Sequence, residues 1–133
     1  MLRSRLAVLL LLPVLLMLMA ARQAPLVDPD PIAIPAKITD AQVAKSIRGA
    51  LINRKWTVTD EKPGEIKSTL MVRDHKVRID ITWDKRQIAI RYVDSENLKY
   101  EVENGKKLIH KNYLGWINNL VTDISANLNL VAE

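Results

Sequence analysis

The fold is decided by residues 66–92, which read IKSTLMVRDHKVRIDITWDKRQIAIRY. Apolar and polar side chains alternate along this stretch, and polar turns interrupt the alternation near Asp74 and between Asp84 and Arg86. A period of two is typical of strands that bury one face. Because the links between these strands are short, we expect antiparallel neighbours, since parallel neighbours need crossovers of about a dozen residues or more.

The same alternation extends the predicted sheet in both directions. It runs through residues 56–60 before a turn at residues 62–64, and it returns in a short stretch at residues 98–102 that ends at an Asn-Gly pair. Asn-Gly and Pro-Gly are residues that tight turns prefer. The sequence therefore predicts an antiparallel meander of four to five strands.

Two amphipathic helices are expected to flank the meander. After a capping residue at Thr39 or Asp40, apolar side chains recur at three- and four-residue steps as far as Leu51. A second apolar stripe begins at Ile109 and reaches Leu128. The sequence therefore predicts an α+β fold, a two-layer sandwich with the N-terminal and the C-terminal helix on one face of the sheet.

The composition limits the chemistry that the chain can perform. Its 133 residues, with a formal net charge of +5, suit one compact domain. The absence of cysteine excludes disulfides, thiol nucleophiles and iron–sulfur ligation. With two histidines and four glycines in the whole sequence, we expect no metal site, no phosphate-cradling loop and no cofactor.

The N-terminal region has the order of a secretory signal peptide. Two arginines precede an unbroken apolar stretch at residues 6–19, and two alanines follow it. This stretch is shorter than the roughly 20 residues of a bilayer-spanning helix. We therefore expect residues 1–21 to be a signal peptide and the mature protein to be periplasmic. The alternative is an uncut signal anchor that tethers the chain to the inner membrane.

A proline-rich stretch follows the predicted signal peptide. Residues 22–36 contain four prolines, which deny helices and sheets their backbone donors. We expect an extended spacer here, with a disordered mature N-terminus as the alternative. A single α+β domain is then expected at residues 37–133.

Two motifs in the second half of the chain resemble a known family. The motifs are DSENLKY at residues 94–100 and IHKNYLGWINNL at residues 109–120. They resemble a pattern shared by small, largely uncharacterised proteobacterial exported proteins and lipoproteins, and the resemblance runs from Lys45 to Leu128. It implies a location in the Gram-negative envelope and no particular activity. Many of those proteins carry a lipobox cysteine that this chain lacks, which argues against a lipid anchor.

Residues in and around these motifs form the first candidate site. Its polar side chains are expected to clasp the last hairpin to the second helix, while its aromatic side chains either build the core or line a small groove there. The residues of this clasp and groove are Tyr92, Asp94, Ser95, Asn97, Tyr100, His110, Asn112, Tyr113 and Trp116.

A small hydrolase is the alternative interpretation of the same motifs. Ser95 would be the nucleophile, His110 the base and Asp94 the carboxylate that orients the base. No G-x-S-x-G elbow surrounds the serine. We therefore expect that the protein is not an enzyme.

Basic residues on the outer face of the predicted sheet form the second candidate site. They are Lys67, Arg73, Lys76, Arg78 and Arg91. Their charge would suit an anionic partner such as lipid head groups or an acidic protein. Acidic neighbours dilute this charge, so an ordinary solvated face is the alternative. Nucleic acid is not an expected partner, because no recognition helix or RNA-stacking motif occurs.

Together these features predict a non-enzymatic binding module of the bacterial cell envelope. Its expected partner is an envelope protein or an anionic envelope component. A structural subunit of an envelope assembly is a further hypothesis, which an unprotected edge strand would favour.

Overall fold

The structure of the protein is a computed structural model that describes residues 22–133. The predicted signal peptide lies outside the described residues. No helix within them is long and apolar enough to cross a bilayer. The elements are, in chain order, β1 (Gln23–Pro25), β2 (Ile32–Ala33), α2 (Asp40–Asn53), β3 (Thr57–Lys62), β4 (Glu65–Val72), β5 (His75–Trp83), β6 (Gln87–Glu96), β7 (Glu101–Glu103), β8 (Lys106–His110) and α3 (Lys111–Ala132).

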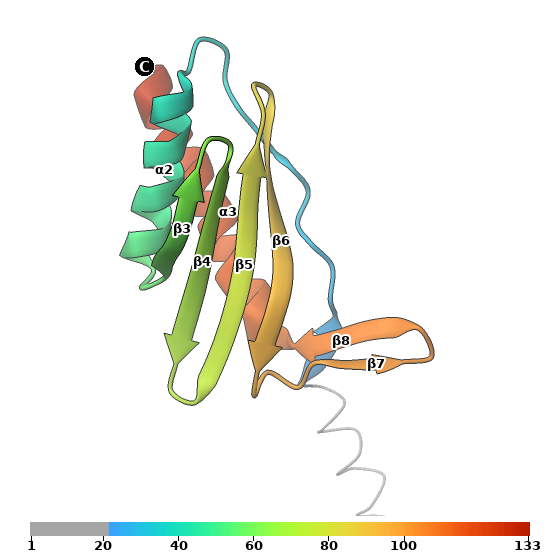
Figure 1. Cartoon of the computed structure of the whole chain (residues 1–133). Helices are drawn as coiled ribbons and strands as arrows, with labels where there is room; N and C mark the ends of the chain where they lie inside the picture. Colours follow the sequence, from blue (N-terminus) through green and yellow to red (C-terminus); the bar gives the residue numbers. More distant parts are fainter. Residues whose placement is uncertain (1–21) are drawn as a thin grey trace, which may run out of the picture.

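The main sheet is a five-stranded antiparallel sheet in the order β2-β6-β5-β4-β3. Both described helices lie against one face of this sheet, as Figure 1 shows. That face buries the apolar side of each central strand. Its fully buried side chains include Ile66, Val77, Ile79, Ile81 and Ile88. The predicted α+β sandwich, with its antiparallel meander and two helices, is therefore confirmed.

The helix α2 begins where the sequence predicts, because a capping box fixes its first turn. The Thr39 hydroxyl accepts from the Gln42 backbone N–H at 3.1 Å, and the Gln42 side-chain oxygen accepts from the Thr39 N–H at 2.9 Å. The apolar stripe of this helix then buries Val43, Ile47 and Leu51 against the sheet and α3.

The region after β6 differs from the prediction in two ways. The strand β7 belongs to a second sheet, in the order β1-β8-β7, instead of extending the meander. The chain leaves the main sheet at Asn97 and Lys99, whose φ angles of 57° and 54° end the extended conformation. The C-terminal helix begins at Lys111, and Ile109 lies in β8. Ile109 fits the helical stripe in the sequence because its strand also points it into the core.

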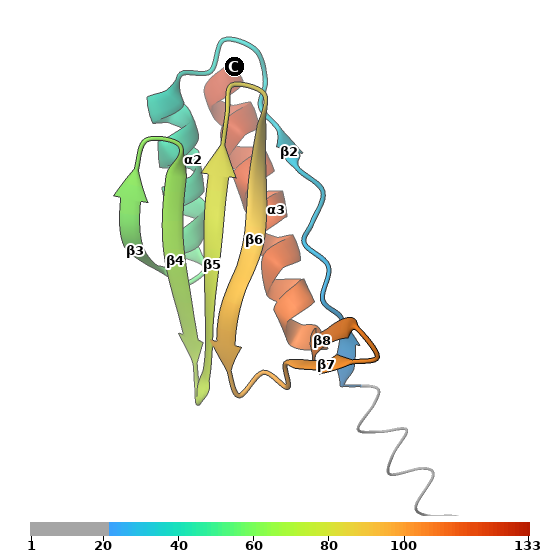
Figure 2. The same ribbon diagram turned by 45° about the vertical axis from the view of Figure 1, so that its right-hand side comes forward.

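The proline-rich stretch is part of the domain, so the prediction of a spacer at residues 22–36 is wrong. Within this stretch β1 pairs with β8, and β2 pairs with β6. Ile32 lies in the core, and the Asp28 carboxylate accepts from the Tyr92 backbone N–H at 3.0 Å. Figure 2 shows the segment running beside β6. Prolines are tolerated here because an outermost strand leaves part of its backbone unpaired.

Candidate functional site

The outer face of the main sheet is not basic, because its register places every cation beside an anion. Three of these pairs are close ion pairs, with N–O distances of 3.4 Å for Lys62–Glu65, 3.6 Å for Lys67–Asp80 and 2.8 Å for Arg78–Asp94. The full set of opposite-charge pairs across the strands is Lys62–Glu65, Asp60–Lys67, Lys67–Asp80, Asp80–Arg91, Arg78–Asp94 and Lys76–Glu96.

This face therefore carries five cations and five anions, and the prediction of a basic sheet surface is wrong. Arg73 lies outside the face, in the turn between β4 and β5, where its φ is 56°. The alternative interpretation, an ordinary solvated sheet surface, fits the register. Charges directly opposite each other stabilise strand pairing and cancel the field that an anionic ligand would need.

The residues of the hydrolase alternative do not come together in the structure. Ser95 and Asp94 are adjacent on β6, so they point to opposite sides of the sheet. The Ser95 hydroxyl lies 2.6 Å from the Tyr92 hydroxyl, and Asp94 pairs with Arg78. The imidazole of His110 is engaged with the first turn of α3 instead.

Polar contacts join three chain segments at the end of the sandwich where the second sheet is attached. The His75 ring bonds with the backbone oxygen of Asn97 through Nδ1. The Asn97 side chain donates to the Asp74 backbone oxygen at 2.9 Å, and the His110 backbone N–H donates to the Leu98 oxygen at 2.7 Å. Asn97 thus holds the turn between β4 and β5, and His110 contacts this segment through its backbone, while Asp94 pairs with Arg78 on the sheet.

His110 is the cap of α3 and sits in a cationic environment. Its Nδ1 accepts from the Asn112 backbone N–H at 3.1 Å, and its ring centroid lies 6.4 Å from that of His75. Partial burial lowers the pKa of His110, and nearby cations lower it further. We call this region the histidine end, which consists of Arg22, His75, Lys99, His110 and Lys111.

The predicted aromatic groove is filled by its own tyrosines. The Tyr92 ring stacks on Tyr100 with centroids 5.4 Å apart, and it meets Tyr113 edge-on at 5.6 Å. Tyr113 is 1% exposed, and its hydroxyl has no hydrogen-bond partner among the described residues. Burial raises the pKa of Tyr113 strongly. Tyr113 belongs to the core, and Tyr92 and the half-buried Trp116 pack against it, whereas Tyr100 is exposed.

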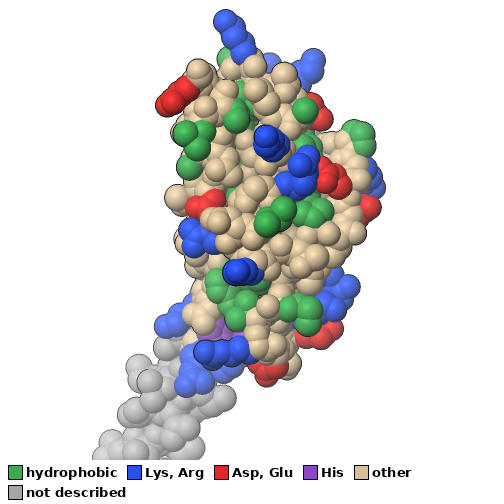
Figure 3. All heavy atoms as spheres, turned by 90° about the vertical axis from the view of Figure 1, so that its left-hand side faces the viewer, with side chains coloured by type: hydrophobic (Ala, Val, Ile, Leu, Met, Phe, Trp, Pro, Cys, Tyr) green, Lys and Arg blue, Asp and Glu red, His purple; other side chains and the backbone are tan. Residues whose placement is uncertain are grey.

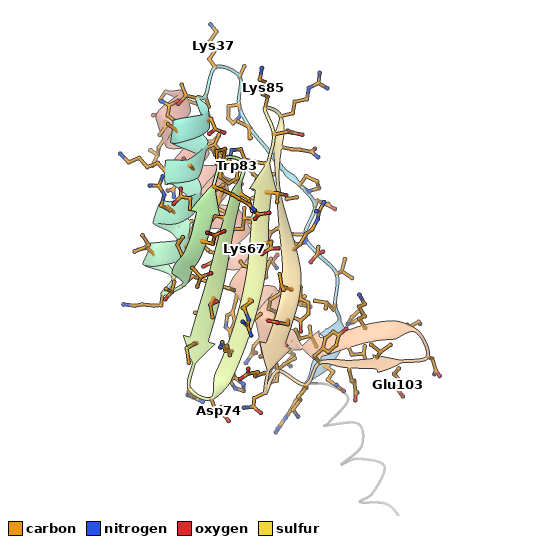
Figure 4. The ribbon with its side chains drawn as sticks, viewed as in Figure 1. Lys37, Lys67, Asp74, Trp83, Lys85 and Glu103 are labelled. Atoms are coloured by element: carbon orange, nitrogen blue, oxygen red, sulfur yellow. The ribbon has the colours of Figure 1, made fainter. Side chains whose placement is uncertain are left out.

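A pocket that the sequence did not predict lies at the opposite end of the sandwich. It has a volume of about 520 Å³ and is lined by residues 34–38, Asp40, Val43 and residues 83–85. The Trp83 indole N–H donates to the Asp40 carboxylate at 2.7 Å, which fixes the ring against the start of α2. Figure 4 shows Trp83 with Lys37 and Lys85 at this end, far from Asp74. We call it the tryptophan pocket.

The acidic and the basic side chains around the tryptophan pocket differ in their contacts. The Asp84 carboxylate accepts from two backbone N–H groups of its own turn, at 2.7 and 2.9 Å, and these bonds lower its pKa. Asp40 already accepts from Trp83. Within residues 22–133, Lys37 and Lys85 form no ion pair. The pocket therefore has apolar walls, and the two exposed lysines lie at its edge beside the carboxylates of Asp40 and Asp84.

Within the same described range, no cluster of three metal-binding side chains could hold an ion. Comparison with protein-family models, with curated proteins and with solved structures gave no match. The resemblance of residues 94–120 to exported proteins therefore stays a prediction, and the function has to be argued from the two ends of the sandwich.

Proposed function

We propose that the protein is an exported, non-enzymatic binding module of the bacterial cell envelope. Its tryptophan pocket takes an apolar ligand that carries an anionic group. The observation that carries this proposal is the position of Trp83, held by Asp40 in a pocket that has Lys37 and Lys85 beside it.

The size and lining of the pocket support a small ligand. Pockets for small molecules are typically about 300–1,000 Å³ and mostly apolar, with a few polar groups that fix orientation. Ile34, Ile38, Val43 and Trp83 supply the apolar walls of this pocket. Because a hydrogen bond holds the indole ring, less conformational freedom is lost when a ligand packs on it.

The sequence supports the cellular setting of the proposal. The apolar stretch at residues 6–19 follows two arginines, as in a signal peptide. The bacterial envelope contains many molecules that join an acyl chain to a carboxylate or a phosphate. Such a ligand would bury its chain against Trp83 and place its anion near the free ammonium groups of Lys37 and Lys85.

The proposal is tested by titrating residues 22–133 with dodecanoate and with the fluorescent probe anilinonaphthalene sulfonate. We expect Trp83→Ala to weaken both interactions by about tenfold or more, because a large aromatic surface is lost. Trp116→Ala is the matched control, because Trp116 is also half-buried but lies on α3 outside the pocket. Equal losses in the two variants would contradict the pocket assignment.

The role of the two lysines is tested by comparing dodecanoate with uncharged dodecanol. We expect the native chain to prefer dodecanoate, and we expect this preference to disappear in the Lys37→Gln, Lys85→Gln double variant. Binding of dodecanol should change little. A preference that survives both substitutions would show that the anion is recognised elsewhere.

A further inference from the structure

The histidine end collects cations from segments that are far apart in the sequence. Arg22, Lys99 and Lys111 all lie close enough to His110 to lower its pKa. Arg73 lies in the turn between β4 and β5, two residues before His75. Figure 3 shows histidine together with several Lys and Arg side chains at the lower end of the molecule.

These cations differ from those on the sheet because they have no ion-pair partner within the described residues. Six of the ion pairs in that range involve other Lys or Arg side chains, and the seventh joins His75 to Asp74. Two carboxylates of this region have other contacts: Asp74 lies 3.8 Å from the His75 Nε2, and Glu101 accepts from Gln23 at 2.9 Å. Glu96 lies across from Lys76 in the sheet. The histidine end therefore presents three cations that form no ion pair within residues 22–133.

The histidine end lies next to the predicted signal peptide in the chain. Arg22 is the first described residue, and it follows directly on the apolar stretch and its two alanines. The backbone oxygen of Arg22 accepts from the Lys111 N–H at 2.8 Å, which fixes this junction to the start of α3. An apolar segment that enters a bilayer during export would thus bring the histidine end to its surface first.

We infer that the histidine end docks on an anionic lipid bilayer through Arg22, Lys99 and Lys111. The tryptophan pocket, at the other end of the sandwich, then faces away from that bilayer (Figure 4). Each Lys or Arg close to an anionic surface strengthens binding by about fivefold. The docking does not need a ligand in the pocket, so it stands independently of the proposed function.

The test is sedimentation of residues 22–133 with lipid vesicles at low and at high salt. This segment contains the complete core of the described structure and both helices that cover the sheet. One set of vesicles contains phosphatidylglycerol in phosphatidylcholine, and the other contains phosphatidylcholine alone. We expect binding to the anionic vesicles only, and we expect high salt to weaken it because salt screens exposed charges.

Two charge-reversal variants with the same net charge separate this inference from a general effect of charge. The first is Arg22→Glu, Lys99→Glu, Lys111→Glu, in which an acidic residue at the start of α3 also suits the helix dipole. The second is Lys37→Glu, Lys85→Glu, Arg86→Glu, at the tryptophan pocket. We expect the first variant to lose about 100-fold or more in partitioning and the second to stay within about twofold of the native chain.

Three results would overturn the inference. They are equal losses in the two variants, equal binding to both kinds of vesicle, and no binding of the native chain to anionic vesicles. The milder variant Arg22→Gln, Lys99→Gln, Lys111→Gln repeats the test without reversing charge. A Trp83→Ala chain should bind anionic vesicles normally, which distinguishes failure of the docking from failure of the pocket proposal.

Discussion

The outer sheet face and the histidine end contain similar Lys and Arg side chains, but these side chains lie beside carboxylates only on the sheet face. On the sheet, antiparallel register places each of five cations beside a carboxylate. At the histidine end, Arg22, Lys99 and Lys111 come from a chain junction, a connecting segment and a helix start, where no neighbouring strand supplies a partner. Regular pairing neutralises charge, whereas cations on connections between elements stay available to a partner.

The largest expected effect concerns the apolar core, which lies beneath the sheet on the side opposite its paired charges. Ile79 is fully buried in the middle of β5. Ile79→Ala should lower the free energy of unfolding by about 2–5 kcal/mol, because it removes buried methyl groups and leaves a cavity. Denaturant unfolding followed by circular dichroism measures this loss. A change no larger than that of an exposed threonine, such as Thr57→Ala on β3, would contradict the packing.

The next effect concerns the cap at the histidine end. His110→Ala removes the acceptor of the Asn112 backbone N–H and should cost about 1 kcal/mol in the free energy of unfolding. His110→Asn should retain most of that stability, because asparagine is a good capping residue. The same denaturant experiment compares the three chains. Equal stability of the alanine and asparagine variants would show that the imidazole is not acting as a cap.

The pH dependence of stability distinguishes the histidine end from the sheet face. Both histidines of the chain lie at the histidine end, and histidine is the side chain that ordinarily titrates near neutrality. The pKa of His110 is lowered in the folded chain, so the unfolded chain takes up its proton first as the pH falls. The contribution of His110 to the free energy of unfolding should be fully present above about pH 6.5, the ordinary pKa of histidine. It should be lost as the pH falls below that value. Thermal unfolding between pH 8 and about 5 measures this slope, above the range in which carboxylates titrate.

The control for that slope is His110→Asn, which keeps a cap but does not titrate. Its stability should change less than that of the native chain over the same pH range. An unchanged slope would assign the pH dependence to another group.

The smallest expected effect is on the sheet face. Arg78 and Asp94 pair at 2.8 Å, but their side chains are 48% and 54% exposed. A double-mutant cycle with Arg78→Ala and Asp94→Ala should give a coupling energy of about 1 kcal/mol or less that shrinks in high salt. A coupling of several kcal/mol would mean that the charge pairs, and not the apolar core, hold this sheet together.

Much of the fold could be predicted from periodicity and capping residues. The alternation in residues 66–92 identified β4, β5 and β6, and a capping residue at Thr39 or Asp40 indicated the start of α2. The short strands β1 and β2 could not be predicted, because three or two residues beside prolines become strands only where a partner edge is present. Ile109 was assigned to the wrong element because a buried strand residue and a helical stripe look alike in sequence.

The candidate site was harder to predict, because it depends on register and on contacts between distant segments. Lys67 reads as a free cation until β5 places Asp80 opposite it. The tryptophan pocket joins residues 34–38, the start of α2 and the turn after Trp83, and each of these stretches is unremarkable alone. The only local signal was an aromatic residue at a strand end beside a turn.

The central claim is that the tryptophan pocket is the binding site, and nuclear magnetic resonance of residues 22–133 titrated with dodecanoate tests it most directly. The account predicts that the indole N–H resonance of Trp83 and the backbone resonances of residues 34–38 shift together and saturate, while those of Trp56 and Trp116 stay in place. Shifts confined to the sheet face or to α3, with the Trp83 resonance unmoved, would contradict it.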